Sequence, residues 1–212
     1  MDSRWRNLIV ILLALALIAG GYIFLFGNGK NPAAAGGETK SIEAKIESVL
    51  AKNGTGMKDF SGKLPVEIAG DEVTTKIKPA SFPSIKSGLA SLTADAKSAQ
   101  EKDLLSIYQS AVLLSETKYD LLRKAQQLSS EINGKTQSEA CAYQDRVNSL
   151  NLKYTVFFIS LNSLSMQELD YSQKYSSPKP LGALNADEER KTMDSLSFLS
   201  ELYNSSCTGV VA

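Results

Sequence analysis

Histidine is absent from the 212 residues of the chain. Its absence removes the side chain most often used for acid–base catalysis near neutral pH, which is also the commonest metal ligand. Cysteine is scarce too: with Cys141 and Cys207 as the only thiols, a four-ligand zinc site cannot be assembled from Cys and His. No D-x-[DN]-x-[DN]-G calcium loop appears either. These absences predict a protein that is not an enzyme and holds no metal or cofactor.

The chain also lacks a concentration of basic residues. Lys and Arg number 23 and are balanced by 23 Asp and Glu, so the formal net charge is zero. Proteins that bind nucleic acids concentrate Lys and Arg to displace counterions from phosphates. We therefore expect no nucleic-acid partner.

Charge is missing altogether from one long stretch near the N-terminus. Residues 8–26 read LIVILLALALIAGGYIFLF, nineteen in a row without a charged side chain. As a helix at ~1.5 Å per residue they span roughly 28 Å, close to the hydrocarbon thickness of a bilayer. Arg4 and Arg6 precede the run and favour a cytoplasmic N-terminus. The pattern predicts a single-pass anchor over residues 1–26, with the lipid bilayer as partner and the rest of the chain outside the cytoplasm.

A cleaved signal peptide is the competing interpretation of the same residues. Ala33 to Ala35 supply an A-x-A site, but hydrophobic cores of signal peptides usually run only about 7–15 residues. The longer run favours an uncleaved anchor, and both interpretations export the domain. Residues 27–38, GNGKNPAAAGGE, then predict a flexible tether before a domain over residues 39–212.

Most of residues 39–212 show the periodicity of amphipathic helices. A short one is stopped by Asn53-Gly54, and stronger patterns cover residues 82–132, 136–173 and 186–203. The phase slips near Asp103, which predicts either two helices or one long helix with a local adjustment. In the third helical pattern, over residues 136–173, Phe157 and Leu161 belong to the inner stripe. Further apolar residues widen this stripe: Phe158, Ile159, Met166 and Leu169. We expect neighbouring helices to cover this widened face.

The turns between these patterns decide the fold class. Asn133-Gly134 ends one helix, and Thr136-x-x-Glu139 is a capping box that starts the next. Short connections favour antiparallel neighbours, so we expect an all-α fold with an N-terminal transmembrane helix and an antiparallel bundle of three or four helices. The heptad-like spacing leaves an extended coiled coil as the alternative. Alternation on either side of Ala69-Gly70-Asp71 adds a small β-hairpin near residues 64–78.

Cys141 lies at the start of the third helical pattern and Cys207 just beyond the last one. If these helices run antiparallel, the chain returns to the end where it began, and residues 174–185 are long enough to make up the difference in helix length. Exported compartments let disulfides persist. We predict a Cys141–Cys207 disulfide, with two free thiols as the alternative.

Other candidate sites are weaker. Asn53 and Asn204 lie in N-x-[ST] patterns and are candidate glycosylation acceptors. The aromatic side chains of Tyr154, Phe157 and Phe158 form either a ligand-binding face or part of the core, and their spacing favours the core. Two charged residues stand at core positions, Lys118 and Glu168; their offsets from the turn differ, so we expect each to snorkel to solvent or mark a packing gap rather than pair directly.

These observations favour a non-enzymatic function. The leading hypothesis is a membrane-anchored extracytoplasmic helical domain that acts as a protein-interaction or structural module of the cell envelope, with a protein partner. The alternative is an exported ligand-binding domain that holds a small apolar molecule between its helices. A filled core with an exposed apolar patch favours the first, whereas a cavity beside Tyr154 and Phe157 favours the second.

Overall fold

The computed structural model describes residues 41–69, 72–191, 194 and 207. Every described residue belongs to one compact unit over residues 40–212. The predicted anchor over residues 1–26 and tether over residues 27–38 thus lie outside the described residues. Among the helices that are described, none is both long and apolar enough to cross a membrane.

Two long helices form the centre of the described unit. α4 (Ala99–Ile132) and α6 (Gln144–Tyr175) are joined by a turn and the short helix α5 (Gln137–Cys141). Gly134 adopts a φ of 77° in the turn, a left-handed conformation that glycine reaches without strain. The Thr136 side chain then accepts a hydrogen bond from the Glu139 N–H. Both features were predicted at these positions because turn and cap signals are local.

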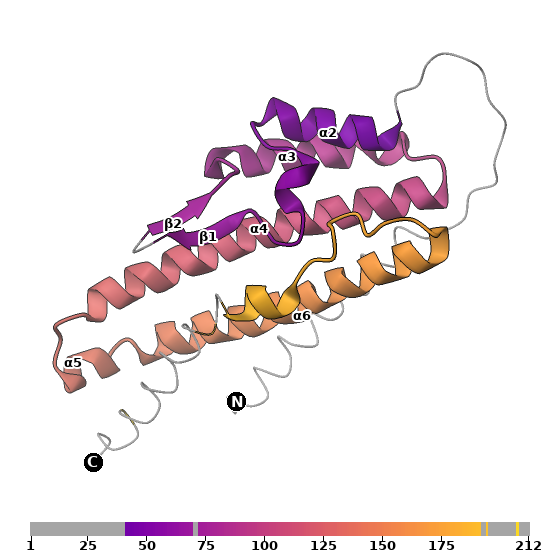
Figure 1. The fold of residues 1–212 in the computed structure, drawn as a ribbon. Coiled ribbons are helices and arrows are strands. Elements are labelled where there is room, and N and C mark those ends of the chain that lie inside the picture. The colour runs from indigo at the N-terminus through magenta and orange to yellow at the C-terminus, as the bar shows by residue number, and fades with distance from the viewer. Residues whose placement is uncertain (1–40, 70–71, 192–193, 195–206, 208–212) are drawn as a thin grey trace. The chain divides into compact units, whose positions relative to one another are not determined.

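α4 and α6 run antiparallel (Figure 1). Gln100, at the start of α4, contacts the Tyr171 hydroxyl near the end of α6, with 3.3 Å between nitrogen and oxygen. At the opposite end, Arg146 of α6 pairs with Glu131 of α4. The predicted antiparallel hairpin of helices is therefore confirmed.

The pattern over residues 82–132 proves to be two helices. α3 (Phe82–Ser91) continues into the 3-10 turn η3 (Leu92–Ala94), and α4 begins only at Ala99. A reciprocal capping box fixes that start, because the Ser98 side chain accepts from the Glu101 N–H while the Glu101 carboxylate accepts from the Ser98 N–H. The break therefore lies a few residues before the phase slip seen in the sequence.

α2 (Ile42–Lys52) and α3 pack on the side of α4 opposite to α6 (Figure 1). The Ser41 side chain caps α2 by accepting from the Ala44 N–H. The predicted stop at Asn53 is also observed, since its backbone N–H bonds back to the Leu50 carbonyl.

The predicted hairpin is present as an antiparallel pair of short strands. β1 (Val66–Ala69) and β2 (Glu72–Thr75) pair with Val66 opposite Thr75. Two single 3-10 turns flank the pair, η1 (Met57–Phe60) and η2 (Pro79–Ser81). Both strands contact α4, which supplies the support that an isolated hairpin lacks in water. The described part of the chain is therefore mostly helical with one small sheet.

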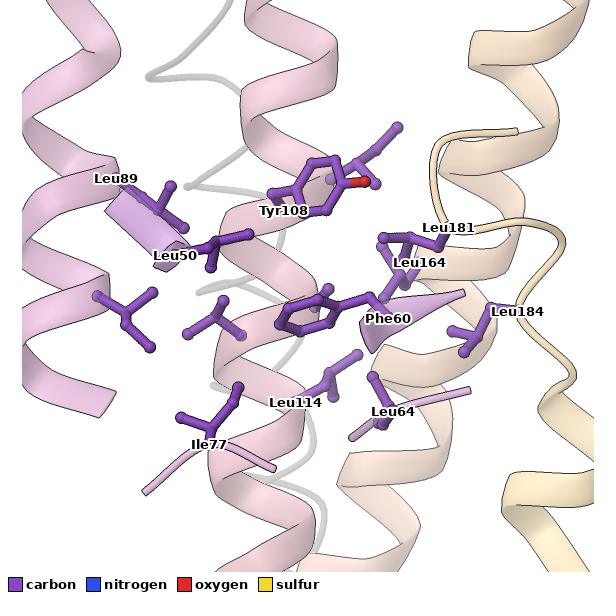
Figure 2. Packing of buried hydrophobic residues seen from close by; sticks show 14 of the residues in the cluster. Leu50, Phe60, Leu64, Ile77, Leu89, Tyr108, Leu114, Leu164, Leu181 and Leu184 are labelled. Carbon is purple, nitrogen blue, oxygen red and sulfur yellow. The ribbon is translucent and has the colours of Figure 1, made fainter. Parts of the chain in front are cut away.

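A large apolar core joins the hairpin to α2, α3, α4 and α6 (Figure 2), and a second, smaller cluster lies around Leu128, Ala140 and Val147. The large core takes side chains from every layer, among them Leu50, Phe60, Ile77, Leu89, Tyr108, Leu114, Leu164 and Leu181. The Phe60 and Tyr108 rings meet edge to face, with centroids 6.0 Å apart. The Tyr108 hydroxyl donates to the Pro180 carbonyl oxygen at 2.9 Å, so the one polar atom of this ring is satisfied inside the core.

The segment after α6 returns along the bundle. Ser176, at a φ of 49°, ends α6, and the following loop inserts Leu181 and Leu184 into the core. Asn185 then caps a new helical stretch over residues 186–191 by accepting from the Glu188 N–H at 3.1 Å. The start of the helix predicted over residues 186–203 is confirmed, whereas most of that helix lies outside the described residues.

Candidate functional site

The aromatic group on α6 is part of the core. Phe157 is 1% exposed, and its ring meets Phe158 edge to face with centroids 6.4 Å apart. The Phe158 ring in turn meets that of Tyr154 at 5.3 Å. The three rings thus pack on one another, as expected for a core stripe.

The polar edge of this group faces the helical stretch after Asn185, of which residues 186–191 and 194 are described; we call these residues the C-terminal segment. The Tyr154 hydroxyl donates to Asp194 Oδ1 at 3.0 Å, and Arg190 places its guanidinium 5.6 Å from the centre of the Phe158 ring. Burial, reinforced by the hydrogen bond to Asp194, raises the pKa of Tyr154 to about 12. The phenol therefore stays protonated at neutral pH and acts as a donor that holds the C-terminal segment against α6.

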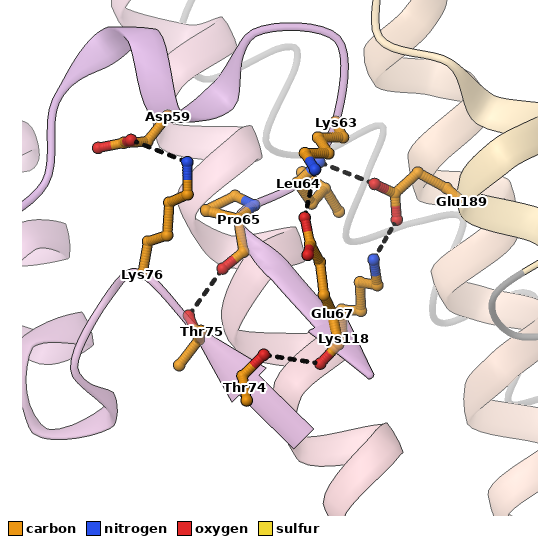
Figure 3. Close-up of polar contacts among 10 residues, drawn as sticks. All are labelled: Asp59, Lys63, Leu64, Pro65, Glu67, Thr74, Thr75, Lys76, Lys118 and Glu189. Atoms are coloured by element: carbon orange, nitrogen blue, oxygen red, sulfur yellow. Dashed lines mark hydrogen bonds and ion pairs between the residues drawn. The ribbon is translucent and has the colours of Figure 1, made fainter. Parts of the chain in front are cut away.

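A buried ion pair ties the same segment to α4. Lys118 Nζ lies 2.6 Å from Glu189 Oε2, and each side chain is 3% exposed. The other carboxylate oxygen accepts from the Leu64 backbone N–H at 2.8 Å, just before β1 (Figure 3). One carboxylate thus links α4, the hairpin and the C-terminal segment. The expectation that Lys118 snorkels is wrong, because an opposite charge reaches it from 71 residues further along the chain.

Glu168 is the second buried carboxylate, and it is 1% exposed. Its two oxygens accept from the backbone N–H groups of Leu181 and Leu184, at 2.6 and 2.9 Å. The expectation that Glu168 snorkels is also wrong, since the chain folds back to supply two donors. No direct pair with Lys118 forms, as predicted. Glu168 acts as a clamp that shapes the loop between α6 and the C-terminal segment.

The cysteines meet at the end of the bundle near α5. Their sulfur atoms lie 2.09 Å apart and their Cα atoms 5.6 Å apart, so Cys141 and Cys207 are at disulfide distance. Cys207 is buried beside Leu128 and Val147. The predicted proximity of the two thiols is observed, and it places Cys207 beside the start of the helical pattern over residues 136–173.

α6 also has an outer face that the structure leaves open. Ile159 is 41% exposed, Met166 64% and Leu169 36%. We define the outer face as these three together with the residues interleaved with them at helical spacing: Leu152, Thr155, Val156, Asn162 and Ser163. Residues 154–167 contain no Asp, Glu, Lys or Arg, although 22% of the whole chain is charged. The expectation that neighbouring helices cover Ile159, Met166 and Leu169 is wrong for the part of the chain that is described, where α4 packs on the opposite side of α6 and these three side chains stay exposed.

Of the two candidate glycosylation sites, Asn53 is described in the structure and Asn204 is not. The Asn53 side-chain nitrogen, to which a glycan would be attached, donates to the Val49 carbonyl oxygen at 2.9 Å. Thr55 of the same acceptor pattern is buried, and its hydroxyl donates to Asp59. A glycan on Asn53 would therefore have to be attached before the domain folds. Asn204 lies outside the described residues.

Catalytic or metal-binding geometry does not emerge from the part of the chain that the structure describes. Within residues 41–69, 72–191, 194 and 207, no three His, Cys, Asp or Glu side chains gather in a way that would hold a metal ion. The two buried carboxylates are occupied by structural partners. Among the described residues, the outer face of α6 is thus a feature that internal packing leaves unexplained.

The chain was compared with protein families, curated proteins and solved structures. The chain matches no protein-family model, no curated protein and no solved structure at a significant level of similarity.

Proposed function

We propose that this chain is a membrane-anchored extracytoplasmic domain that acts as a protein-interaction or structural module of the cell envelope. The observation that carries the proposal is the outer face of α6, on which Ile159, Met166 and Leu169 are exposed with no charged side chain between them on that face. Charged residues are depleted at the centres of protein interfaces, and Met is enriched there. The apolar side chains of a face with this composition gain free energy when a partner covers them.

The location rests on the sequence. The uncharged run over residues 8–26 is long enough to span a bilayer, and the positive charges before it favour export of the residues after it. The disulfide distance between Cys141 and Cys207 supports an oxidising compartment, where such a bond persists.

The alternative, a domain that binds a small apolar molecule, has less support. It needs space beside Tyr154 and Phe157, where the aromatic rings pack edge to face and the Tyr154 hydroxyl is engaged by Asp194. The open outer face favours the interaction module.

Site-specific photo-crosslinking of the full chain in its native membrane tests the proposal. A photoreactive amino acid at Met166 should give discrete protein adducts on illumination. The matched control carries the same group at Lys124, an exposed residue of α4 outside the outer face, and should give none. Proximity labelling from the C-terminus reports in parallel which proteins lie nearby and on which side of the membrane. The proposal fails if Met166 gives no protein adduct, or if the labelled neighbours are all cytoplasmic.

A further inference from the structure

We propose that the outer face of α6 binds a helix of another envelope protein, one that has an apolar stripe with a lysine or arginine at each end of it. This inference rests on the proposed function, because it names the kind of partner that covers the same surface. The charges at the two ends of the outer face carry it.

Asp145 and Asp170 lie at the two ends of the outer face, on the same side of α6. Counted from Ile159 at ~100° per residue, Asp170 lies about 20° around the helix and Asp145 about 40°, in the same direction. Both side chains are exposed. Between them, no residue within about 60° of Ile159 is charged. The two carboxylates therefore mark the ends of an uncharged, partly apolar strip about 37 Å long, at ~1.5 Å per residue.

The described part of the chain supplies neither carboxylate with a basic partner. Among the described residues, no ion pair includes Asp145 or Asp170. Lys174 follows Asp170 at the spacing of a helical ion pair, but its ammonium group lies 2.9 Å from Asp103 of α4 instead. The other basic residues of α6 lie more than about 100° around the helix from Ile159. Both carboxylates are therefore open to the basic side chains of a partner.

These charges discriminate between occupants of the outer face. A partner with basic residues opposite Asp145 and Asp170 forms two ion pairs, while its uncharged stripe covers Ile159 and Met166 without desolvating a charge. A second copy of this chain would bring its own acidic ends against these two in either direction of pairing, and like charges opposed across an interface cost free energy. A bilayer surface rich in anionic lipids carries the same sign of charge. The outer face therefore complements a helix of a different protein with basic ends.

The distance between the carboxylates also restricts the packing angle. Helices that pack on each other cross mostly at about 20° or about −50°. Each carboxylate lies about 19 Å from the middle of the strip, where the partner axis is displaced sideways by about 6 Å at the smaller angle and about 14 Å at the larger. A lysine or arginine side chain can span the first displacement but not the second. We therefore expect the partner helix to run nearly along α6, in either direction, with its basic residues about 25 positions apart.

The size of the strip sets the expected effect of these charges. A surface one helix wide buries less than the ~800 Å² per partner of a standard interface, so apolar contact alone should bind weakly. Two exposed ion pairs together should raise the affinity about two- to thirty-fold. The charges at the ends therefore decide which helices bind.

Photo-crosslinking with designed peptides tests this selection. The probe is a helical peptide of about 28 residues with a leucine stripe and a lysine at each end of it, about 25 positions apart. Two control peptides carry glutamine or glutamate at the same positions. The full chain, with a photoreactive amino acid at Met166, is held in nanodiscs of uncharged phosphatidylcholine. The lysine peptide should give about two to thirty times more adduct than the glutamine peptide, and the glutamate peptide should give less than either.

Variants of the chain show whether Asp145 and Asp170 are responsible for the preference. In D145N/D170N the three peptides should give equal adduct, and in D145K/D170K the glutamate peptide should give the most. The matched control D120N/E72Q removes two exposed carboxylates outside the outer face and should keep the order of the unaltered chain. Equal adduct from all three peptides with the unaltered chain refutes the inference, and so does an unchanged order in D145N/D170N.

The same photoreactive group at Met166 in native membranes tests the inference on the natural partner. The yield of protein adduct should fall about two- to thirty-fold in D145N/D170N and stay unchanged in D120N/E72Q. An adduct between two copies of the chain, or with lipid alone, overturns the inference. Adducts with another envelope protein at a yield that does not depend on the two carboxylates also overturn it but leave the proposed function standing. Absence of any protein adduct removes both, so the two failures are distinguishable.

Discussion

The ion pair between Lys118 and Glu189 offers the sharpest test of how this fold is held together. Both side chains are 3% exposed, and their charged atoms lie 2.6 Å apart. Breaking a buried pair by removing one partner leaves an uncompensated charge and costs about 3–5 kcal/mol. Lys118→Met and Glu189→Gln should each lower the free energy of unfolding by about this amount.

The double variant K118M/E189Q separates the charge from the packing. It leaves neither charge behind, and the glutamine oxygen can still accept from the Leu64 N–H that Glu189 Oε1 binds at 2.8 Å. Replacing both members of a buried pair is far milder than removing one, so we expect a loss of only about 1–2 kcal/mol. That value is well below the sum of the single effects, as it must be for two residues that contact each other.

Urea unfolding of the full chain in mild detergent provides the measurement. Far-UV circular dichroism is the suitable probe, because the only tryptophan is Trp5, within the predicted anchor. Lys45→Met is the matched control: its pair with Asp95 is 3.0 Å long but half exposed on the carboxylate side, so its loss should cost at most about 1 kcal/mol. The reasoning is refuted if the single effects of Lys118 and Glu189 simply add in the double variant, or if Lys118→Met is as mild as the control.

Three further outcomes follow from the same structure. The Cys141–Cys207 bond joins residues 66 positions apart, so reducing it should lower the free energy of unfolding by about 4 kcal/mol in the chain-entropy model. Thermal melts with and without reductant measure this loss. Identical melts, with both thiols alkylatable before reduction, would contradict it. Glu168→Gln should cost about 1–3 kcal/mol in a urea titration, because the amide keeps one oxygen for two backbone donors; a loss indistinguishable from zero would show that the clamp adds nothing. The Ser98 N–H donates to the Glu101 carboxylate and holds the pKa of Glu101 below its ordinary value of 4.5, although burial acts in the opposite direction. The ionised Glu101 therefore stabilises the folded state above that pH, and this stabilisation is lost as the pH falls through the folded-state pKa. Unfolding titrations from about pH 6 to about pH 3 should therefore show a shallower loss of stability for Glu101→Gln than for the unaltered chain, and parallel curves would refute the assignment.

Several buried polar contacts hold the C-terminal segment and the loop before it. Glu189 reaches α4 and the hairpin, the Glu168 clamp fixes the loop before it, and Tyr154 holds Asp194. Tyr154 and Glu168 make their contacts from α6, and the disulfide distance between Cys141 and Cys207 adds one at α5. Loss of any one should loosen this segment before the apolar core of α2, α3 and α4.

The sequence by itself determined the local features of this protein. The helix start at Thr136, the stops at Asn53 and Gly134 and the cap at Asn185 follow from side-chain and backbone bonds within four residues. The short turn between α4 and α6 also determined their antiparallel direction, and the alternation near Ala69 determined the hairpin. Such signals are readable because everything they require is close in the chain.

Only the tertiary structure decided which charges are buried and which apolar face stays open. Periodicity placed Lys118 and Glu168 on inner faces, but their partners come from residues 189 and 181–184, and nothing local specifies how the chain will return there. The widened apolar pattern around Ile159 and Met166 likewise gave the composition of α6 without the number of neighbours available to cover it. Burial is a property of the packed layers, and a helix with apolar residues on two sides has one side exposed when the described layers cover only the other.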